Sequence, residues 1–599
     1  MDRRTFLAFG LIFLIIIGYP MLMEKFFPQP EQPLTAVPDS TAAVVENTTP
    51  ETATDPTFTE PTPTETATIA EENIPAQTTP LTADEALALV PGGSEETVWV
   101  KTPLYRVEIS TRGGRITKWE GYEHKHWEGG PVNLVPEGVP DTGLDAVLFR
   151  GGDLFLGHAV YEADRSSLDL GVGSQPGILT LTAVTAGGLE IRKIFTFHPD
   201  LYGVEVDLVV AAPDEAARQS FSLVGSPDKF RFGWNQGIAP TERIQKMELP
   251  SLRAMSLIGE DVQKKKRQDL KKGVEKVEVQ GHGSVKYAAL QNRYFGIYGI
   301  VPQEQGGPVE GSIRLSGDQD LEAQSWAIDL PAERGTGEEV AVARLDLFIG
   351  PQDAKLLEPY GDDLVKSMDL GVKLIRPLSE VVLWSLEFLH RVIPNYGWII
   401  IIFSILTKLA FYPLTKTSTE SMKKMQELQP KMKALQEKYK NDKEKLNKAT
   451  MELYQKEKVN PLSGCLPLVV QMPVFFALYQ ALSHTISLRG QPWILWIKDL
   501  SQPDALFTMP FGLPFLGSDF NVLPILMSVA MYFQTKLTPT TGGGQMAMMN
   551  TMMPVIMIFI FYNMPSGLVL YWLVNTLLQG YQTWKIHQTA PTPGGNEAT

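Results

Sequence analysis

The chain has 599 residues and a formal net charge of −15 at pH 7, a length that predicts several domains. Its one cysteine, Cys465, excludes a structural disulfide and a cysteine-rich metal site. No Walker A loop, Gly-x-Ser-x-Gly elbow, dinucleotide fingerprint or His-x-x-x-His pair occurs in the sequence. We therefore expect no metal, cofactor or nucleotide, and the missing motifs disfavour an enzyme.

The N-terminal part predicts an anchor followed by a tether. Residues 1–25 carry Arg3 and Arg4 before an apolar run that is longer than the core of a cleaved signal peptide. We expect an uncleaved transmembrane anchor with a cytoplasmic start, and cleavage is the alternative. Residues 26–97 are rich in Thr, Pro, Glu and Ala and contain no Lys or Arg. Such a segment buries too little apolar surface to fold, so we expect a disordered acidic tether on the far side of the membrane.

Residues 98–365 change to short alternating runs such as GILTLTAV and LEIRKIFTF, separated by Gly, Pro and Asp. Alternation of period two with β-branched residues predicts strands with one buried face, and many such strands favour a β-sandwich. Turns are expected at 112–114 and 198–200. The charged run 260–275 predicts a solvated loop or a surface helix. A sandwich of this kind could hold a carbohydrate or a peptide, but the sequence marks no site in it.

Residues 371–394 predict an amphipathic helix. Apolar side chains fall on one face, and charged residues, including Glu380 and Glu387, fall largely on the other. Pro377 would begin the helix and Pro394 would end it. We expect this helix to lie on the membrane surface, and a helix packed within the soluble domain is the alternative.

The apolar run 396–414 is long enough to cross a bilayer as a helix, and it contains one cation, Lys408. Two interpretations of this lysine stay open. Its ammonium could reach the nearby headgroups, or it could be the fixed charge of a water-filled cavity open to the cytoplasm. The polar neighbours Ser404 and Thr407, one turn away, favour the cavity.

The segment 415–460 carries 12 Lys against 7 Asp and Glu, an excess of +5, so we expect it in the cytoplasm. Apolar residues recur every three or four positions on both sides of Asn441 and Asp442. This pattern predicts an antiparallel helical hairpin with a kink near Pro430. The hairpin is either a solvated pair of helices or a docking arm for acidic partners, such as ribosomal RNA or anionic lipid headgroups.

The remaining sequence predicts four more spans. The first, 463–484, contains Gln471, which could line the same cavity as Lys408. Aromatic residues between 485 and 520 indicate the outer interface of the membrane. The last three spans bring the C-terminus to the cytoplasm before a disordered tail, and they are expected at 521–537, 549–562 and 568–586, with the tail at 590–599. The predicted fold is an α-helical membrane protein of six transmembrane helices, five of them in a core at 396–589, with a large exported β-sandwich domain and a cytoplasmic helical hairpin.

Several stretches resemble the YidC/Oxa family of membrane protein insertases, namely PLTKTSTESMKKMQELQPKMKALQEKYKNDKEK, LYQKEKVNPLSGCLPLVVQMPVFFALYQAL, LRGQPWILWIKDLS and MPSGLVLYWLVN. The exported domain resembles that of the Gram-negative, six-span form through GGRITKW, NRYFGIY and Gly350-Pro351. This resemblance implies an insertase and chaperone, not an enzyme. It would move hydrophobic segments of nascent proteins into the inner membrane, alone or with the Sec translocon. Both termini would be cytoplasmic and the large domain periplasmic.

The resemblance also implies a site, a hydrophilic groove open to the cytoplasm and to lipid. Its cation would be Lys408, its polar lining Ser404 and Gln471, and its client-contacting apolar slide Phe475, Tyr571 and Trp572. Implied partners are nascent membrane proteins and the Sec translocon. From the residues we also expect membrane lipids and, through the Lys-rich segment 415–460, ribosomes, with no nucleotide.

Two other classes of function remain alternatives. A membrane-anchored enzyme acting on glycans needs a carboxylate pair in the exported domain. A secondary transporter needs paired broken helices in two halves, an internal repeat that this sequence does not display.

Overall fold

The computed structural model describes residues 81–588, apart from gaps at 138–144, 150–151, 236, 267–278, 303–309, 318–323, 373, 441, 458, 460–465, 514–515 and 538–543. The chain divides into two compact units, Met1–Leu81 and Thr82–Thr599, and all that follows concerns the second. The expected anchor 1–25, most of the expected tether and the expected tail 590–599 lie outside the described residues.

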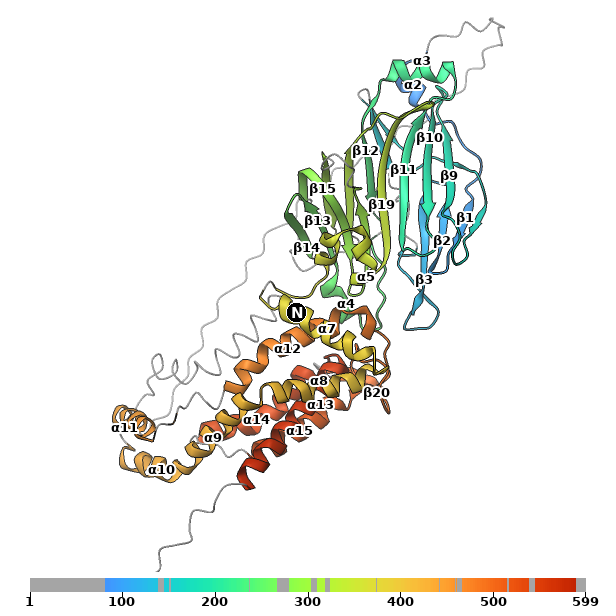
Figure 1. Ribbon diagram of the computed structural model, residues 1–599. Coiled ribbons are helices and arrows are strands. Elements are labelled where there is room, and N and C mark those ends of the chain that lie inside the picture. Colours follow the sequence, from blue (N-terminus) through green and yellow to red (C-terminus); the bar gives the residue numbers. More distant parts are fainter. Residues whose placement is uncertain are drawn as a thin grey trace, which may run out of the picture. The chain divides into compact units, whose positions relative to one another are not determined.

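Two β-sheets form the β-rich part of the described chain (Figure 1). The smaller has the order β4-β3-β2-β1-β8, with bounds β1 Thr97–Lys101, β2 Tyr105–Ser110, β3 Arg115–Lys125, β4 Pro131–Asn133 and β8 Ser167–Asp169. The larger has 14 strands in the order β6-β5-β12-β18-β17-β15-β16-β19-β11-β10-β9-β7, with β13 pairing β15, and β14 pairing β13. Its bounds are β5 Asp145–Phe149, β6 Gly152–Phe155, β7 Glu162–Ala163, β9 Gly177–Val184, β10 Glu190–Phe197, β11 Gly203–Ala211, β12 Pro227–Trp234, β13 Arg253–Ile258, β14 Asp261–Lys266, β15 Val279–Gln291, β16 Phe295–Ile300, β17 Glu310–Gly317, β18 Gln324–Pro331 and β19 Glu339–Pro351.

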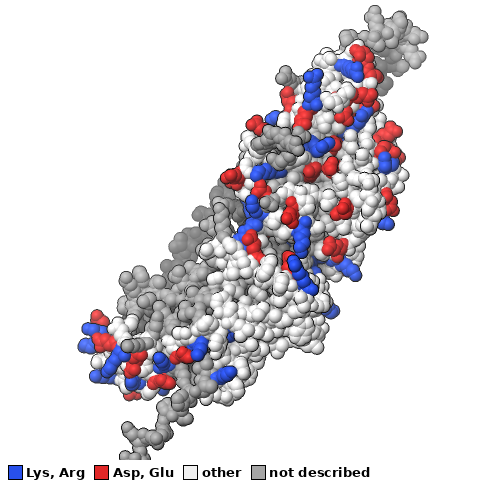
Figure 2. Space-filling model, in the orientation of Figure 1, with Lys and Arg blue, Asp and Glu red and all other residues white. Residues whose placement is uncertain are grey.

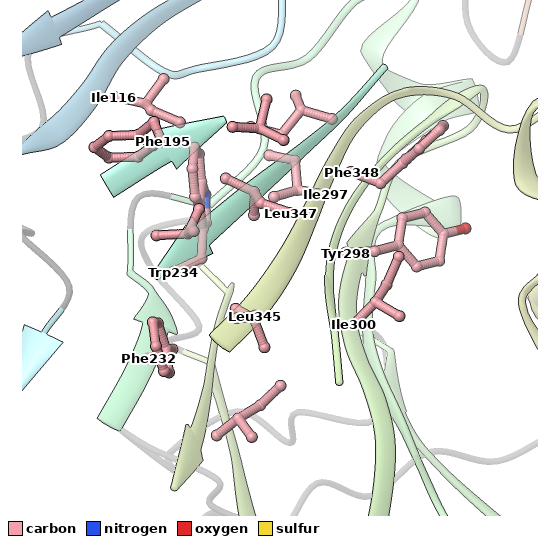
Figure 3. Packing of buried hydrophobic residues seen from close by; sticks show 14 of the residues in the cluster. Ile116, Phe195, Phe232, Trp234, Ile297, Tyr298, Ile300, Leu345, Leu347 and Phe348 are labelled. Atoms are coloured by element: carbon pink, nitrogen blue, oxygen red, sulfur yellow. The ribbon is translucent and has the colours of Figure 1, made fainter. Parts of the chain in front are cut away.

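The alternating sequence of the strands becomes an alternating burial. Along β10 every second residue is buried, and the strand pairs antiparallel with both β9 and β11. The buried side chains of one strand meet those of the others in a common apolar layer (Figure 3), to which β3 gives Ile116, β10 Phe195, β12 Trp234, and β19 Leu345 and Leu347. Burial of this layer is the main source of stability of the domain, because each fully buried large side chain contributes about 1.5–3 kcal/mol.

The turn expected at 112–114 joins β2 to β3. Gly113 and Gly114 both have positive φ, 71° and 56°, which a residue with a side chain rarely adopts. The ammonium of Lys193, a buried inward position of β10, donates to the carbonyl oxygens of both glycines at 3.1 and 3.2 Å. The cation is thereby accommodated in the core, and it fixes the turn.

Two expectations for this domain were wrong in detail. The run 260–275 is not a loop or a helix over 261–266, because β14 pairs with β13 along its whole length. The tether does not extend to 97, because the described chain has structure from Thr82. A capping box between Thr82 and Glu85 begins helix α2 (Ala83–Leu87), and Leu89 bridges to Thr185 at the sheet. Burial of Ala86 and Leu87 explains why this acidic stretch is ordered.

Short helices accompany the sheets, namely α3 Glu215–Val224, α4 Gln245–Glu248, η1 Leu249–Ser251, α5 Ala354–Leu357, η3 Glu358–Tyr360 and α6 Asp362–Ser367. The C-terminal part is helical, with α7 Arg376–His390, α8 Tyr396–Ala410, α9 Tyr412–Glu427, α10 Gln429–Lys438, α11 Lys443–Lys456, α12 Leu466–His484, η5 Ile486–Leu488, α13 Leu523–Leu537, α14 Gly544–Phe561 and α15 Ser566–Gln588. A hairpin of β20 (Ala505–Leu513) and β21 (Gly517–Asn521) lies between α12 and α13 in the chain.

The run 396–414 is not one continuous helix. α8 ends at Ala410 and α9 begins at Tyr412, because Pro413 lacks the N–H that would continue the ladder and is tolerated only in a first turn. α9 then runs past 415 to Glu427, so the expected start of the cytoplasmic hairpin falls inside a helix. No described helix combines the length and the apolar character that crossing a bilayer requires.

Candidate functional site: a polar seam between apolar helices

The five helices α8, α12, α13, α14 and α15 are apolar, and their charged residues are all lysines. These are Lys408 in α8, Lys536 in α13 and Lys585 in α15. Figure 2 displays the same contrast on one face: Lys, Arg, Asp and Glu are dense over the β-sheets and over α10 and α11, and sparse over α13, α14 and α15. A helix that is apolar on its outer face belongs in a core or in a bilayer.

Lys408 lies in the last turn of α8 and is half-buried. Its ammonium donates a hydrogen bond to Oε1 of Gln579 on α15, 171 residues further along the chain. The packing of α15 against α8 brings the two residues together. The hydrogen bond of Lys408 thus goes to Gln579 rather than to Ser404 or Gln471.

Gln471 and Ser404 occupy different places. Gln471 on α12 donates from Nε2 to the hydroxyl of Tyr571 on α15 at 2.5 Å. Ser404 is fully buried, and its hydroxyl donates to the carbonyl of Ile400 in its own helix at 2.7 Å. The structure therefore joins Gln471 to a residue expected in the slide, whereas Ser404 satisfies its hydroxyl locally.

The expected slide residues are largely buried. Phe475 of α12 makes an edge contact with Trp572 of α15 at 5.1 Å between ring centroids, and Phe561 of α14 contacts both rings. Phe475, Phe561 and Tyr571 are all buried, and Trp572 is half-buried. These aromatic side chains pack α12, α14 and α15 against one another. Among them, Trp572 keeps exposed surface.

Sequence reasoning missed a row of polar residues on α15. Asn575, Gln579 and Gln582 follow one another at spacings of four and three, which places them on one face of a helix. Gln582 and Thr415 of α9 exchange hydrogen bonds at 3.3 and 3.4 Å, and both are buried. The spacing of amides within an apolar run was the signal that could have revealed them.

These contacts make a polar seam along α15, which we define as Lys408, Thr415, Gln471, Gln579 and Gln582 with their partners. Its hydrogen bonds join α8, α9 and α12 to the same helix. In an apolar surrounding a polar group without a partner costs several kcal/mol, so polar groups gather and pair. Lys408, Gln471 and Gln579 are half-buried and keep surface at which a polar chain can pair with them, whereas Thr415 and Gln582 are buried.

The Lys-rich segment forms the expected hairpin beyond α9. α10 begins after Leu428 with Pro430 in its first turn, which accounts for the predicted kink. Asp442 caps α11 by accepting from the amide of Lys445 at 3.0 Å. The two arms are tied by an ion pair of 2.7 Å between Lys431 and Glu457.

Two family models together match most of the described chain. The YidC periplasmic domain matches residues 97–384, and the 60Kd inner membrane protein family matches residues 388–593. The "Membrane protein insertase YidC" of Syntrophus aciditrophicus is 32% identical over 601 residues, covering 98% of this chain and all of that protein. The chain belongs to the YidC family of membrane protein insertases.

A second YidC relative, from Geobacter sulfurreducens, is 34% identical and covers 82% of this chain and 86% of its own length. Among solved structures, the "Active YidC insertase crystal structure with the first transmembrane domain resolved" is 19% identical, with a TM-score of 0.35, covering 83% of this chain and 95% of that one. By the family models, the β-rich part is the YidC periplasmic domain, and the helices after α7 lie in the residues that match the 60Kd inner membrane protein family.

Proposed function

We propose that this protein inserts and folds nascent membrane proteins in the inner membrane of a Gram-negative bacterium, alone or beside the Sec translocon. The observation that carries the mechanism is the polar seam, with the ammonium of Lys408 beside Gln579 between apolar helices. In this proposal α8, α12, α13, α14 and α15 cross the membrane, and 1–25 supplies a sixth span. The termini are cytoplasmic and the β-rich domain is periplasmic.

The direction of the helices fits this topology. Alternating crossings place the C-terminal ends of α8, α13 and α15 on the cytoplasmic side, and the lysines of these helices, Lys408, Lys536 and Lys585, lie toward those ends. This distribution obeys the positive-inside rule. The Lys-rich hairpin of α10 and α11 then extends into the cytoplasm, where we propose that it meets ribosomes or anionic lipids.

The seam shortens the apolar distance that a polar client segment must cross. α8 and α13 have 15 residues each, about 22 Å at 1.5 Å rise per residue, against about 30 Å for the hydrocarbon core. A short helix favours a locally thinner bilayer. Seam amides replace part of the hydration of the client chain, and its apolar segment then passes Trp572 into lipid, which drives completion.

Lys408 adds an attraction for acidic client residues. Two opposite charges 4 Å apart gain about 1 kcal/mol in water and about 4 kcal/mol at an effective dielectric constant of about 20. An interaction of this size retains a segment briefly and still lets it leave. The proposal needs no nucleotide hydrolysis.

The test is depletion of the resident insertase and complementation with Lys408→Arg, Lys408→Ala and Lys408→Glu. Lys536→Glu is the matched control, because Lys536 also lies in the last turn of an apolar helix but is exposed. We expect Lys408→Glu to lose insertion of clients with acidic translocated segments while Lys536→Glu retains it. Equal insertion by the two charge reversals would remove the proposed role of Lys408.

One pocket among the described strands of the β-rich domain does not favour a glycan-acting enzyme. Its lining is mainly apolar, with Phe195, Trp234 and Trp326, and includes no Asp or Glu. Glycoside hydrolysis uses a pair of carboxyl groups.

A further inference from the structure

The β20–β21 hairpin was not predicted from the sequence, and the polar seam does not involve it. Its strands pair antiparallel between α12 and α13, with Phe507 opposite Phe520. Between Asp504 and Asp519 the chain carries no charged residue. A strand pair of this kind alone is marginally stable, so its position depends on what holds its base.

Buried polar groups hold the base of the hairpin. The carboxylate of Asp504 accepts from the indole N–H of Trp496 at 3.0 Å and from the amides of Val522 and Leu523 at 3.0 and 2.6 Å. Leu523 begins α13, so the first strand is fixed to the start of that helix.

The second strand is fixed to the end of α14. The side-chain amide of Asn521 donates to the carbonyl of Tyr562 at 2.6 Å, and the Tyr562 hydroxyl donates to the carbonyl of Asp519 at 2.9 Å. Tyr562 directly follows α14. Both strands are thus held beside the start of α13 and the end of α14.

The hairpin and the neighbouring turn expose an apolar surface, which we call the outer patch. Leu495 is 82% exposed and Phe511 61% exposed. Phe507 is exposed although its ring stacks on that of Phe520, with centroids 5.0 Å apart and an interplanar angle of 11°. The outer patch consists of Ile494, Leu495, Leu506, Phe507 and Phe511.

A fixed apolar patch of this kind marks a surface that another apolar partner covers, because its exposure to water is unfavourable. We propose that the outer patch lies in the outer leaflet of the membrane, against lipid acyl chains at the level where headgroups meet hydrocarbon. The inference rests on the proposed function, in which α13 and α14 cross the bilayer. In that topology the start of α13 and the end of α14 face the periplasm.

Three observations favour lipid as the occupant. The patch continues directly from the outer ends of two membrane helices, through Asp504 and Asn521. Its aromatic, uncharged composition is typical of the membrane interface. Charge within the hairpin is confined to its base, where Asp519 pairs with Arg243 of the periplasmic domain at 2.6 Å, and in the neighbouring turn the exposed Lys498 follows Leu495 by three residues.

The depth is limited by the backbone. Two strands leave unpaired N–H and C=O groups along their outer edges, and hydrocarbon cannot satisfy them. The hairpin therefore stays at the interface, where its side chains reach the acyl chains. It would hold the outer ends of α13 and α14 at a constant depth.

The experiment uses the full-length protein with Cys465→Ser, which removes the only native cysteine. Single cysteines are introduced by Phe511→Cys and by two reference changes. Val172→Cys reports water, because Val172 is 93% exposed in the periplasmic domain; Phe533→Cys reports the bilayer, because Phe533 is 63% exposed on α13. Each variant is labelled with the fluorophore NBD and reconstituted in vesicles of phosphatidylethanolamine and phosphatidylglycerol. Thermal unfolding of each labelled protein is compared with that of the parent.

We expect the label at 511 to emit at shorter wavelength than the label at 172. A nitroxide near the lipid headgroup should quench it more than a nitroxide near the end of the acyl chain. The label at 533 should also be quenched, and the label at 172 should not.

Quenching at 533 together with a water-like, unquenched label at 511 would overturn the inference and leave the proposed function standing. No quenching at either position would remove the membrane placement of α13, and the proposed function with it. A label at 511 that is shielded in native membranes but not in vesicles would mean a protein occupant, which also overturns the inference. If Phe511→Cys unfolds, Leu495→Cys gives the same test.

Discussion

A buried ion pair between the periplasmic domain and the loop after α12 gives the sharpest stability prediction. Nε of Arg489 lies 2.5 Å from Oε1 of Glu242, and the side chains are only 6% and 4% exposed. The other guanidinium nitrogens donate to the carbonyls of Lys125 and Thr241 at 2.9 and 3.0 Å. Gln502 completes the site by donating to Oε2 of Glu242 at 2.6 Å.

Arg489→Ala leaves the Glu242 carboxylate buried without its cation and two carbonyl groups without donors. Removing one partner of a buried pair costs about 3–5 kcal/mol, because the remaining charge is uncompensated. A tenfold change in an equilibrium constant corresponds to about 1.4 kcal/mol, so local opening should become about 10²- to 10⁴-fold more frequent. The amides of residues 237–248 should exchange with solvent faster by that factor.

Hydrogen–deuterium exchange with mass spectrometry on the full chain measures this effect. The matched control is Arg344→Ala, because Arg344 pairs with Asp207 at 2.6 Å but is 53% exposed. Such pairs contribute about 0–1 kcal/mol, so exchange around the control should change at most about fivefold.

The double variant Arg489→Ala/Glu242→Gln should recover part of the loss, since the charge left behind is then gone. Equal exchange in Arg489→Ala and the control, or no recovery in the double variant, would refute the reasoning.

Three further predictions follow from burial and packing. Burial, reinforced by Glu242, raises the pKa of Glu248 from 4.5 to about 7, so the folded state keeps a proton that the unfolded state releases near pH 4.5. The free energy of unfolding should therefore fall as the pH rises from 4.5 to 7, by on the order of 3 kcal/mol, and Glu248→Gln should flatten a pH series of thermal unfolding. Gly299→Ala places a Cβ 2.4 Å from the ring of Trp326 and should lower the free energy of unfolding by about 1–3 kcal/mol, measured by circular dichroism. The control Gly121→Ala, at a strand position where the Cβ meets no atom within 4 Å, should leave the free energy of unfolding without such a loss. Phe475→Ala removes a ring that packs between three helices and should lower the free energy of unfolding in detergent by about 3–5 kcal/mol, and Phe475→Leu should lower it less. A variant that loses client crosslinking but keeps its stability would contradict this structural role.

The sequence by itself determined those features that depend on neighbours along the chain. Period-two alternation placed β9 and β10, paired glycines placed the turn at 113 and 114, and Asp442 marked the start of α11. These signals are local, because side-chain direction repeats every two residues in a strand and every 3.6 in a helix. The family motifs in the helical half were equally readable, and the comparisons confirmed the family.

Only the tertiary structure decided which distant residues meet. Side-chain hydrogen bonds join Lys408 to Gln579, Gln471 to Tyr571, and Arg489 to Glu242, which are 171, 100 and 247 residues apart in the chain. Residues 261–266 form a strand because they pair with the edge of β13, although their charged sequence predicted a solvated loop or a surface helix. The physical reason is that a polar group gains its partner from packing between elements, and no period along the chain encodes that packing.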